Sequence, residues 1–268
     1  MNNSQKILPP KYRVLIALPQ NDFDPSEVAI PWSYLNSKNI AIVFATPTGS
    51  MAQADLIMVT GKTLGILKNS LIADKNAQIA YAKLITSKEF NNPISYEDID
   101  AADYSALILP GGHAKGIRPY LESNTLQQII INFNQSRKLI AAICHGVLLL
   151  ARSIDPQTKK SIIYDKNITT LPAWMELLAY YLTCLWKGSY YRTYPNTTTQ
   201  KEVTSLMKDT NNFSIGPFAL KRDTAETLKD GFIVKSDNII TARWPGDVHL
   251  FSQQIELTLQ KSGKTSFL

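Results

Sequence analysis

The chain alternates uninterrupted apolar runs with segments of helical spacing. Strands of a parallel sheet that is covered on both faces carry apolar side chains continuously, so each run predicts a buried strand. The runs span residues 12–19, 39–47, 106–110 and 139–143. Helical patterns lie between and after them, over residues 24–37, 66–86, 125–133, 172–185 and 247–259. We therefore predict an α/β fold, a doubly wound parallel sheet with helices on both faces.

The start of the first helix carries a clear capping signal. Asp24 is a typical N-cap, Pro25 suits the first helical position, and Glu27 stands three residues after the cap, as in a capping box. Two hairpins are predicted as well, a small one over residues 161–171 and a closing one over residues 232–243.

Composition indicates a globular protein that works without a membrane or nucleic acid. The 268 residues are 44% apolar and 19% charged, and no apolar stretch reaches the roughly 18 residues that indicate a membrane span. The net charge of +6 is spread without a basic stripe, which argues against nucleic-acid binding. The first residues, 1–6, lack the apolar core of a signal peptide, so we expect a cytoplasmic protein.

Cysteines and histidines are few. Two cysteines, Cys144 and Cys184, make no disulfide framework, which fits a reducing compartment. The three histidines are widely separated and show no ligand spacing, so no metal site is expected.

Cys144 lies at the point where the last buried run turns into a helix. Small residues flank it, Ala142 before and Gly146 after, as in a nucleophile elbow with sulfur in place of a hydroxyl. The positive end of the following helix favours a thiolate, so Cys144 is a candidate nucleophile. The alternative is an inert core cysteine, since free cysteine is often buried.

Two motifs give the chain a family resemblance. Pro110-Gly111-Gly112-His113-Ala114 ends one predicted strand, and Ala142-Ile143-Cys144-His145-Gly146 ends the next. With the acidic helix start at Glu27, they resemble the ThiJ/PfpI superfamily of the class I glutamine amidotransferase-like group, most of all the branch with heat-shock chaperones and glyoxalase III. The resemblance implies a flavodoxin-like sheet in one domain over residues 1–268. It also implies a homodimer.

The resemblance covers residues 12–150 and 230–259. Between them, residues 155–225 are longer and more individual, with an aromatic and polar stretch at residues 186–200. We expect this segment to be an inserted helical and aromatic lobe over the site. Its tyrosines are more typical of packing than of a substrate cage: Tyr190, Tyr191 and Tyr194.

Within the resemblance, His145 is the second member of a Cys-His-acid triad, and the acid comes from a variable downstream segment. Glu176 fits that place best, because an isolated carboxylate in an apolar helix needs a partner and an imidazole N–H can supply one. Asp165 and Asp247 are the alternatives.

Glu27 matches the family's acidic residue beside the sulfur, where a carboxyl and a thiol would share a proton. Its alternative role is only to cap the helix, as the last residue of the capping box.

The backbone N–H groups of Gly112 and His145 correspond to an oxyanion hole in the family arrangement. Four further residues are candidates for the substrate pocket: His113, Trp244, Asp247 and His249.

These residues imply a cofactor-independent cysteine enzyme with a small-molecule carbonyl substrate. Cys144 would either convert a 2-oxoaldehyde to a 2-hydroxy acid or hydrolyse an amide. A different class is a stress-response chaperone or redox sensor, in which a low-pKa Cys144 is oxidised to a sulfinic acid stabilised by Glu27. A class I glutaminase is disfavoured, because His249-Leu250-Phe251 lacks the glutamate of the required His-x-Glu pair.

Overall fold

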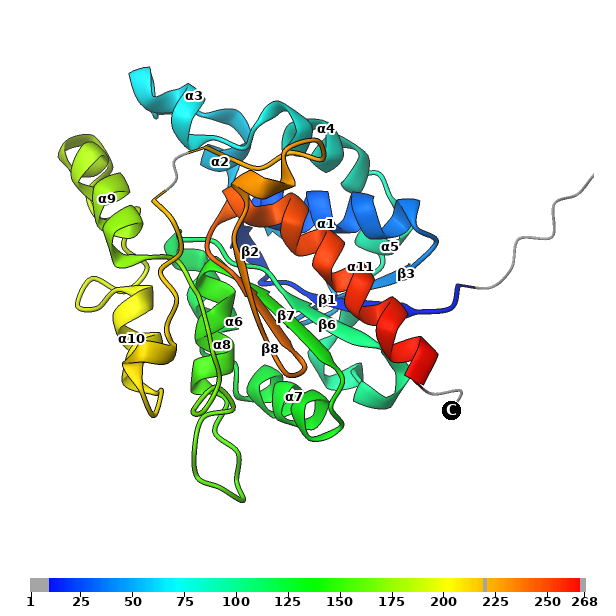
Figure 1. Cartoon of the computed structure of the whole chain (residues 1–268). Coiled ribbons are helices and arrows are strands. Elements are labelled where there is room, and N and C mark those ends of the chain that lie inside the picture. Colours follow the sequence, from blue (N-terminus) through cyan, green and yellow to red (C-terminus); the bar gives the residue numbers. More distant parts are fainter. Residues whose placement is uncertain (1–9, 219–220, 266–268) are drawn as a thin grey trace, which may run out of the picture.

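A seven-stranded sheet forms the frame of the molecule in a computed structural model that describes residues 10–218 and 221–265 (Figure 1). Its strand order is β5-β3-β1-β6-β7-β9-β8, and every neighbouring pair is parallel except the edge pair β8 and β9. Its strands are β1 Arg13–Ala17, β3 Ala41–Thr46, β5 Ile94–Ser95, β6 Ala106–Leu109, β7 Leu139–Ile143, β8 Ile233–Ser236 and β9 Ile239–Ala242. The predicted doubly wound sheet is confirmed.

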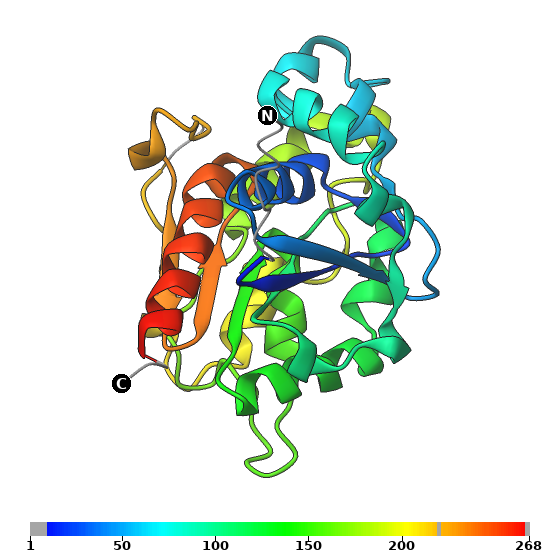
Figure 2. The same cartoon turned by 90° about the vertical axis from the view of Figure 1, so that its right-hand side faces the viewer.

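Helices cover both faces of the sheet. They are α1 Pro25–Ser37, α2 Leu56–Thr60, α3 Lys68–Leu71, α4 Lys75–Leu84, α5 Lys88–Asn91, α6 Arg118–Leu121, α7 Asn124–Gln135, α8 Val147–Arg152, α9 Ala173–Lys187, α10 Thr199–Ser205 and α11 Val248–Thr265. One apolar core joins the sheet to α1 and α11, and a second joins it to α7 and α8 on the other face (Figure 2). Both central strands, β6 and β7, are buried at every position, as expected for a sheet covered on both sides.

Two local predictions fail. The helix expected over residues 66–86 is broken, because Asp74 leaves the helical path and its side chain caps α4 by accepting from the Ala77 amide at 3.0 Å. The hairpin expected over residues 161–171 does not form either. Single bridges pair Ile154 with Ser161 and Ile168 with Phe213 instead.

A small second sheet was not anticipated from the sequence. Its strands, β2 Asn21–Phe23 and β4 Gln53–Ala54, pair in parallel beyond the carboxyl end of β1. Both are too short to give a periodic apolar signal.

The segment after α8 carries α9 and α10. The shorter of these helices, α10, packs against both α8 and α9 (Figure 1). Within residues 10–218 and 221–265, no helix is long and apolar enough to cross a membrane. The N-terminal residues 1–6, which we examined for a signal peptide, lie outside the described part of the chain.

Candidate functional site

Cys144 occupies a sharp turn between β7 and α8. Its φ of 57° lies in the left-handed region, where a residue with a side chain carries roughly 1–3 kcal/mol of strain. Gly146 makes the turn possible, because a Cβ there would lie 2.2 Å from the Leu109 carbonyl oxygen. The Thr170 hydroxyl donates to the Cys144 carbonyl at 2.8 Å and holds the turn from outside. The predicted elbow geometry is therefore present.

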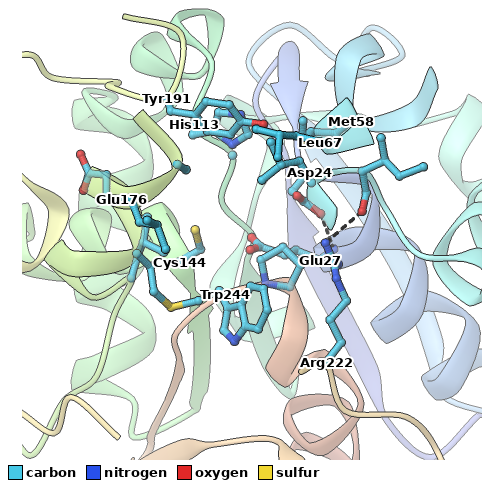
Figure 3. Close-up of a pocket in the computed structure, with 18 of the residues that line it drawn as sticks. Asp24, Glu27, Met58, Leu67, His113, Cys144, Glu176, Tyr191, Arg222 and Trp244 are labelled. Carbon is cyan, nitrogen blue, oxygen red and sulfur yellow. Dashed lines mark hydrogen bonds between the residues drawn. The ribbon is translucent and has the colours of Figure 1, made fainter. Parts of the chain in front are cut away.

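Glu27 reaches the same point from the start of α1. The Asp24 amide donates to the Gly111 carbonyl at 2.9 Å, and the Gly111 amide donates to Glu27 Oε2 at 2.7 Å. Asp24 caps the helix alone, accepting from the amides of Ser26 and Glu27. The Glu27 side chain is thus free of the capping box, and its carboxyl points toward Cys144 (Figure 3).

Burial sets the protonation of this pair. It raises the pKa of the Glu27 carboxyl well above its ordinary value, with a further contribution from the charge of Asp24. Burial is also the largest cause that raises the pKa of the Cys144 thiol. The charges of Glu27 and Asp24 raise this pKa further, while the hydrogen bond from the His145 amide lowers it. Desolvation therefore outweighs the effect of the helix N-terminus on Cys144. The pKa of the thiol is raised, whereas the elbow alone predicted that it would be lowered. Burial therefore favours the protonated form of both groups.

His145 is held with an unprotonated nitrogen facing the sulfur. Its Nδ1 lies 3.4 Å from Cys144 Sγ, and its Nε2 lies 3.1 Å from Thr193 Oγ1. The Thr193 hydroxyl donates its one hydrogen to the His113 carbonyl at 2.6 Å, so it must accept from His145 Nε2–H. Burial, followed by the charges of His113 and Arg152, lowers the pKa of His145 to about 3. His145 is therefore a neutral imidazole whose unprotonated Nδ1 faces the thiol.

Glu176 does not pair with His145 in the described structure. Its carboxylate accepts from the Thr199 amide at 2.9 Å and lies 3.4 Å from Arg192 Nε, pointing away from Cys144 (Figure 3). It thereby ties α9 to α10 and to the segment between them. The expected acid partner of His145 is replaced by a neutral hydroxyl.

The two alternative acids are also elsewhere. Asp165 is exposed and pairs with Lys166 at 3.0 Å. Asp247 is fully buried against Arg243, with 2.8 Å between its Oδ1 and the guanidinium Nη2. Thr193, the residue that does meet His145, lies in an unpatterned stretch, and nothing in its sequence context singles it out.

A cavity of about 640 Å³ opens in front of Cys144. On one side lie Glu27, Gly112 and Cys144, which we call the strand-end wall. On the other side lies the α9 wall, formed by side chains of α9 (Figure 3). A Cβ at Gly112 would lie 2.3 Å from the Asp22 carbonyl oxygen, so a glycine is required where this backbone approaches the cavity.

Two of the four predicted pocket residues line this cavity, namely His113 and Trp244. Asp247 and His249 are not among its lining residues: Asp247 holds Arg243, and the His249 amide donates to Asp223 Oδ1 at 3.1 Å. Three further lining residues were not predicted for the pocket: Asp24, Tyr191 and Arg222. Asp24 was assigned to the helix cap and Tyr191 to packing, and Arg222 lies in a segment without a clear pattern.

The aromatic stretch after α9 packs on the strand-end wall. Tyr191 stacks on His113 with ring centroids 4.5 Å apart, and Tyr190 meets the same ring edge-on. Tyr194 lies against the guanidinium groups of Arg118 and Arg152. The tyrosines therefore pack as expected, although Tyr191 also lines the cavity. Across residues 10–218 and 221–265, no group of three or more His, Cys, Asp or Glu side chains could hold a metal ion.

Comparisons with known proteins agree with this fold. A family model described as ThiJ/PfpI family-like matches residues 18–217. An uncharacterised protein of Schizosaccharomyces pombe is 26% identical over 196 residues, 69% of each chain. The glutathione-independent glyoxalase hsp3102 of the same yeast is 27% identical over 146 residues, covering 54% of this chain and 57% of the relative. Glyoxalase III of Candida albicans superimposes with a TM-score of 0.61 and 20% identity, over 92% of this chain and 96% of that structure.

Proposed function

Because the chain belongs to the ThiJ/PfpI family, we propose that it is a cofactor-independent cysteine enzyme that converts a 2-oxoaldehyde to a 2-hydroxy acid. The observation that carries the proposal is that an imidazole and a carboxyl both lie beside Cys144. His145 Nδ1 lies 3.4 Å from the sulfur, and the Glu27 carboxyl, whose pKa is raised by burial, points toward Cys144 (Figure 3). The names of two similar proteins, a glutathione-independent glyoxalase and a glyoxalase III, support aldehyde chemistry.

The first step is addition of the thiol to the aldehyde. As the bond between sulfur and the aldehyde carbon forms, His145 Nδ1 takes the thiol proton and Glu27 gives its proton to the aldehyde oxygen. The product is a hemithioacetal. The amides of Gly112 and His145 are the proposed donors to the oxygen while its charge develops.

The second step moves hydrogen within the substrate. The Glu27 carboxylate removes the hydrogen on the former aldehyde carbon, and His145 returns its proton to the neighbouring ketone oxygen, which gives an enediol. Glu27 then protonates the former ketone carbon, while the hydroxyl on the sulfur-bearing carbon loses its proton to the Glu27 carboxylate. The resulting thioester is hydrolysed by water, which frees the 2-hydroxy acid and restores the thiol. No external oxidant or reductant is needed.

This geometry favours aldehyde chemistry over the other functions considered. Amide hydrolysis needs no base for a carbon-bound hydrogen, whereas Glu27 is placed to supply one. A redox sensor depends on an accessible thiolate. Cys144 is only 6% exposed, and burial raises the pKa of its thiol.

The test is turnover of methylglyoxal without glutathione, followed as formation of lactate, in parallel with hydrolysis of simple amides. We expect Cys144→Ser to lower kcat/KM for methylglyoxal by at least about a thousandfold, because a serine hydroxyl is a far weaker nucleophile here. Cys184→Ser is the matched control. That cysteine is half-buried on α9 outside the cavity, and its loss should leave turnover unchanged. Wild-type protein that consumes amides but no 2-oxoaldehyde would refute the proposal.

A further inference from the structure

The cavity is far larger than a three-carbon substrate requires. Its volume of about 640 Å³ lies within the roughly 300–1,000 Å³ of pockets that enclose drug-sized ligands. Methylglyoxal occupies about the space of four water molecules, roughly 120 Å³ at about 30 Å³ each. Most of the cavity would therefore stay empty or wet around such a small molecule.

The space beyond Cys144 is bounded mainly by apolar side chains. They come from α9 on one side and from the α2 and α3 region on the other (Figure 3): Met58, Leu71, Ile72, Met175, Leu178 and Leu182. Two of them remain open to solvent in the free protein, Leu178 at 39% and Leu182 at 47% exposure. Apolar surface left open inside a cavity gains stability when an apolar ligand covers it.

Unpaired polar atoms also line the cavity, and one of them, Glu27 Oε1, lies at its Cys144 end (Figure 3). Tyr191 OH and Arg222 Nη1 are likewise buried without a hydrogen-bond partner in the described structure, and so is His113 Nε2, which lies 3.9 Å from Asp55 Oδ2. Buried polar groups are normally paired, so unpaired ones at a cavity indicate polar atoms of a ligand. The two neighbouring oxygens of a 2-oxoaldehyde would lie at the Cys144 end.

The arginine on the cavity wall, Arg222, lies close to carboxyl groups of this chain. The Arg222 guanidinium lies 4.0 Å from Asp74 and donates to the Ile72 carbonyl at 2.9 Å. Its charge also acts on buried Asp24, whose pKa it lowers against the larger effect of burial. The Arg222 guanidinium thus has two carboxyl groups of this chain near it, although its Nη1 has no hydrogen-bond partner in the described structure. Because Asp24, Glu27 and Asp74 all line the cavity, an uncharged substituent is favoured over an anionic one.

We propose that the cavity selects a 2-oxoaldehyde whose second substituent is an uncharged apolar group of about six carbons or more, alkyl or aryl, lying against the α9 wall. The inference rests on the proposed function. The dicarbonyl end lies at Cys144, and the apolar group replaces water along Leu178 and Leu182. Each methylene moved from water to an apolar surface is worth about fourfold in binding or in kcat/KM.

The first experiment compares kcat/KM for methylglyoxal, hexylglyoxal, phenylglyoxal and a hexyl analogue that ends in a carboxylate. We expect hexylglyoxal and phenylglyoxal to exceed methylglyoxal by at least about thirtyfold, less than full burial of the chain would give. The carboxylate analogue should lose most of that advantage. Equal kcat/KM values for methylglyoxal and hexylglyoxal would overturn the inference and leave the proposed function standing.

A matched pair of variants on α9 locates the apolar group. In Leu182→Asp a charge enters the cavity wall, and the preference for hexylglyoxal over methylglyoxal should fall about tenfold or more. Leu185→Asp changes a residue of the same helix that is 93% exposed and outside the cavity, so the preference should persist. A preference unchanged in Leu182→Asp would count against this wall as the binding surface.

A second readout does not depend on turnover. The rate at which N-alkylmaleimides label Cys144, followed by mass spectrometry in the Cys184→Ser background, should rise with alkyl length in wild type and lose that dependence in Leu182→Asp. If no 2-oxoaldehyde is consumed, the proposed function fails, and this series still decides whether an apolar chain enters beside Cys144. A labelling rate independent of chain length overturns the inference.

Discussion

The two walls of the cavity are built in different ways. The strand-end wall is tied to the end of the sheet, where the Gly111 carbonyl accepts from the Asp24 amide and the Gly111 amide donates to Glu27. In the α9 wall the comparable contact, Glu176 with the Thr199 amide, joins α9 to α10 instead. The proposed reactive groups therefore belong to the wall that is tied to the sheet. The α9 wall and the segment after it shape and orient the site, and substitutions on the two sides should have different consequences.

The sharpest test of the strand-end wall is Glu27→Gln. The amide keeps the size of the side chain and can accept from Gly111, but it cannot give and take a proton. We expect kcat for the preferred 2-oxoaldehyde to fall about a thousandfold, within the usual range for loss of a general acid-base group. A fall of less than about threefold would show that Glu27 moves no proton in the reaction.

The pH profile of the wild type provides a second measure of Glu27. Addition to the aldehyde requires the protonated carboxyl, and burial raises the pKa of that group. Activity should therefore be present below that raised pKa and be lost as the pH rises through it. In Glu27→Gln, the residual activity should lack this alkaline limb.

A smaller effect is expected at Thr193, on the segment that follows α9. Thr193→Val keeps the shape but leaves His145 Nε2–H unpaired, so the tautomer with a free Nδ1 is no longer favoured. Loss of one hydrogen bond, roughly 1 kcal/mol, predicts a fall in kcat of about fivefold to tenfold with little change in KM.

Thr193→Ser is the control, since its hydroxyl can make the same two contacts and should restore kcat. The proposed role of Thr193 is to position His145. If the valine and serine variants are impaired equally, packing of the methyl group matters more than orientation of His145.

The smallest effect on catalysis is expected for Glu176→Gln. The amide can still accept from Thr199, but the charge opposite Arg192 is lost from a largely buried pair. We expect the free energy of unfolding, measured by urea denaturation, to fall by about 1–2 kcal/mol, while kcat changes less than about threefold. A large loss of kcat with unchanged stability would restore Glu176 as the acid partner of His145.

Much of the strand-end wall could be predicted from the sequence. Continuous apolar runs predicted β1, β3, β6 and β7, because a strand that is buried on both faces of a parallel sheet carries apolar side chains at nearly every position. Asp24 and Pro25 predicted the start of α1, since capping is a local interaction. The inward turn of Glu27, with its carboxyl beside Cys144, also followed from the motif in its family context.

The contacts of the α9 wall and of the segment after it could not be predicted from the sequence. Helix α9 itself was predicted, but its packing against α10 decides that Glu176 meets Thr199 and Arg192 rather than His145. Thr193 lies 48 residues from His145 along the chain, and no local pattern links a threonine in a loop to an imidazole at a strand end.

The sequence by itself determined which groups are candidates to react, because the elbow around Cys144 and the start of α1 are fixed by short-range backbone geometry and by burial. The tertiary structure decided how those groups are protonated and what fills the space in front of them. Desolvation, which raises the pKa of both Cys144 and Glu27, and the size of the cavity arise only when separate segments pack together.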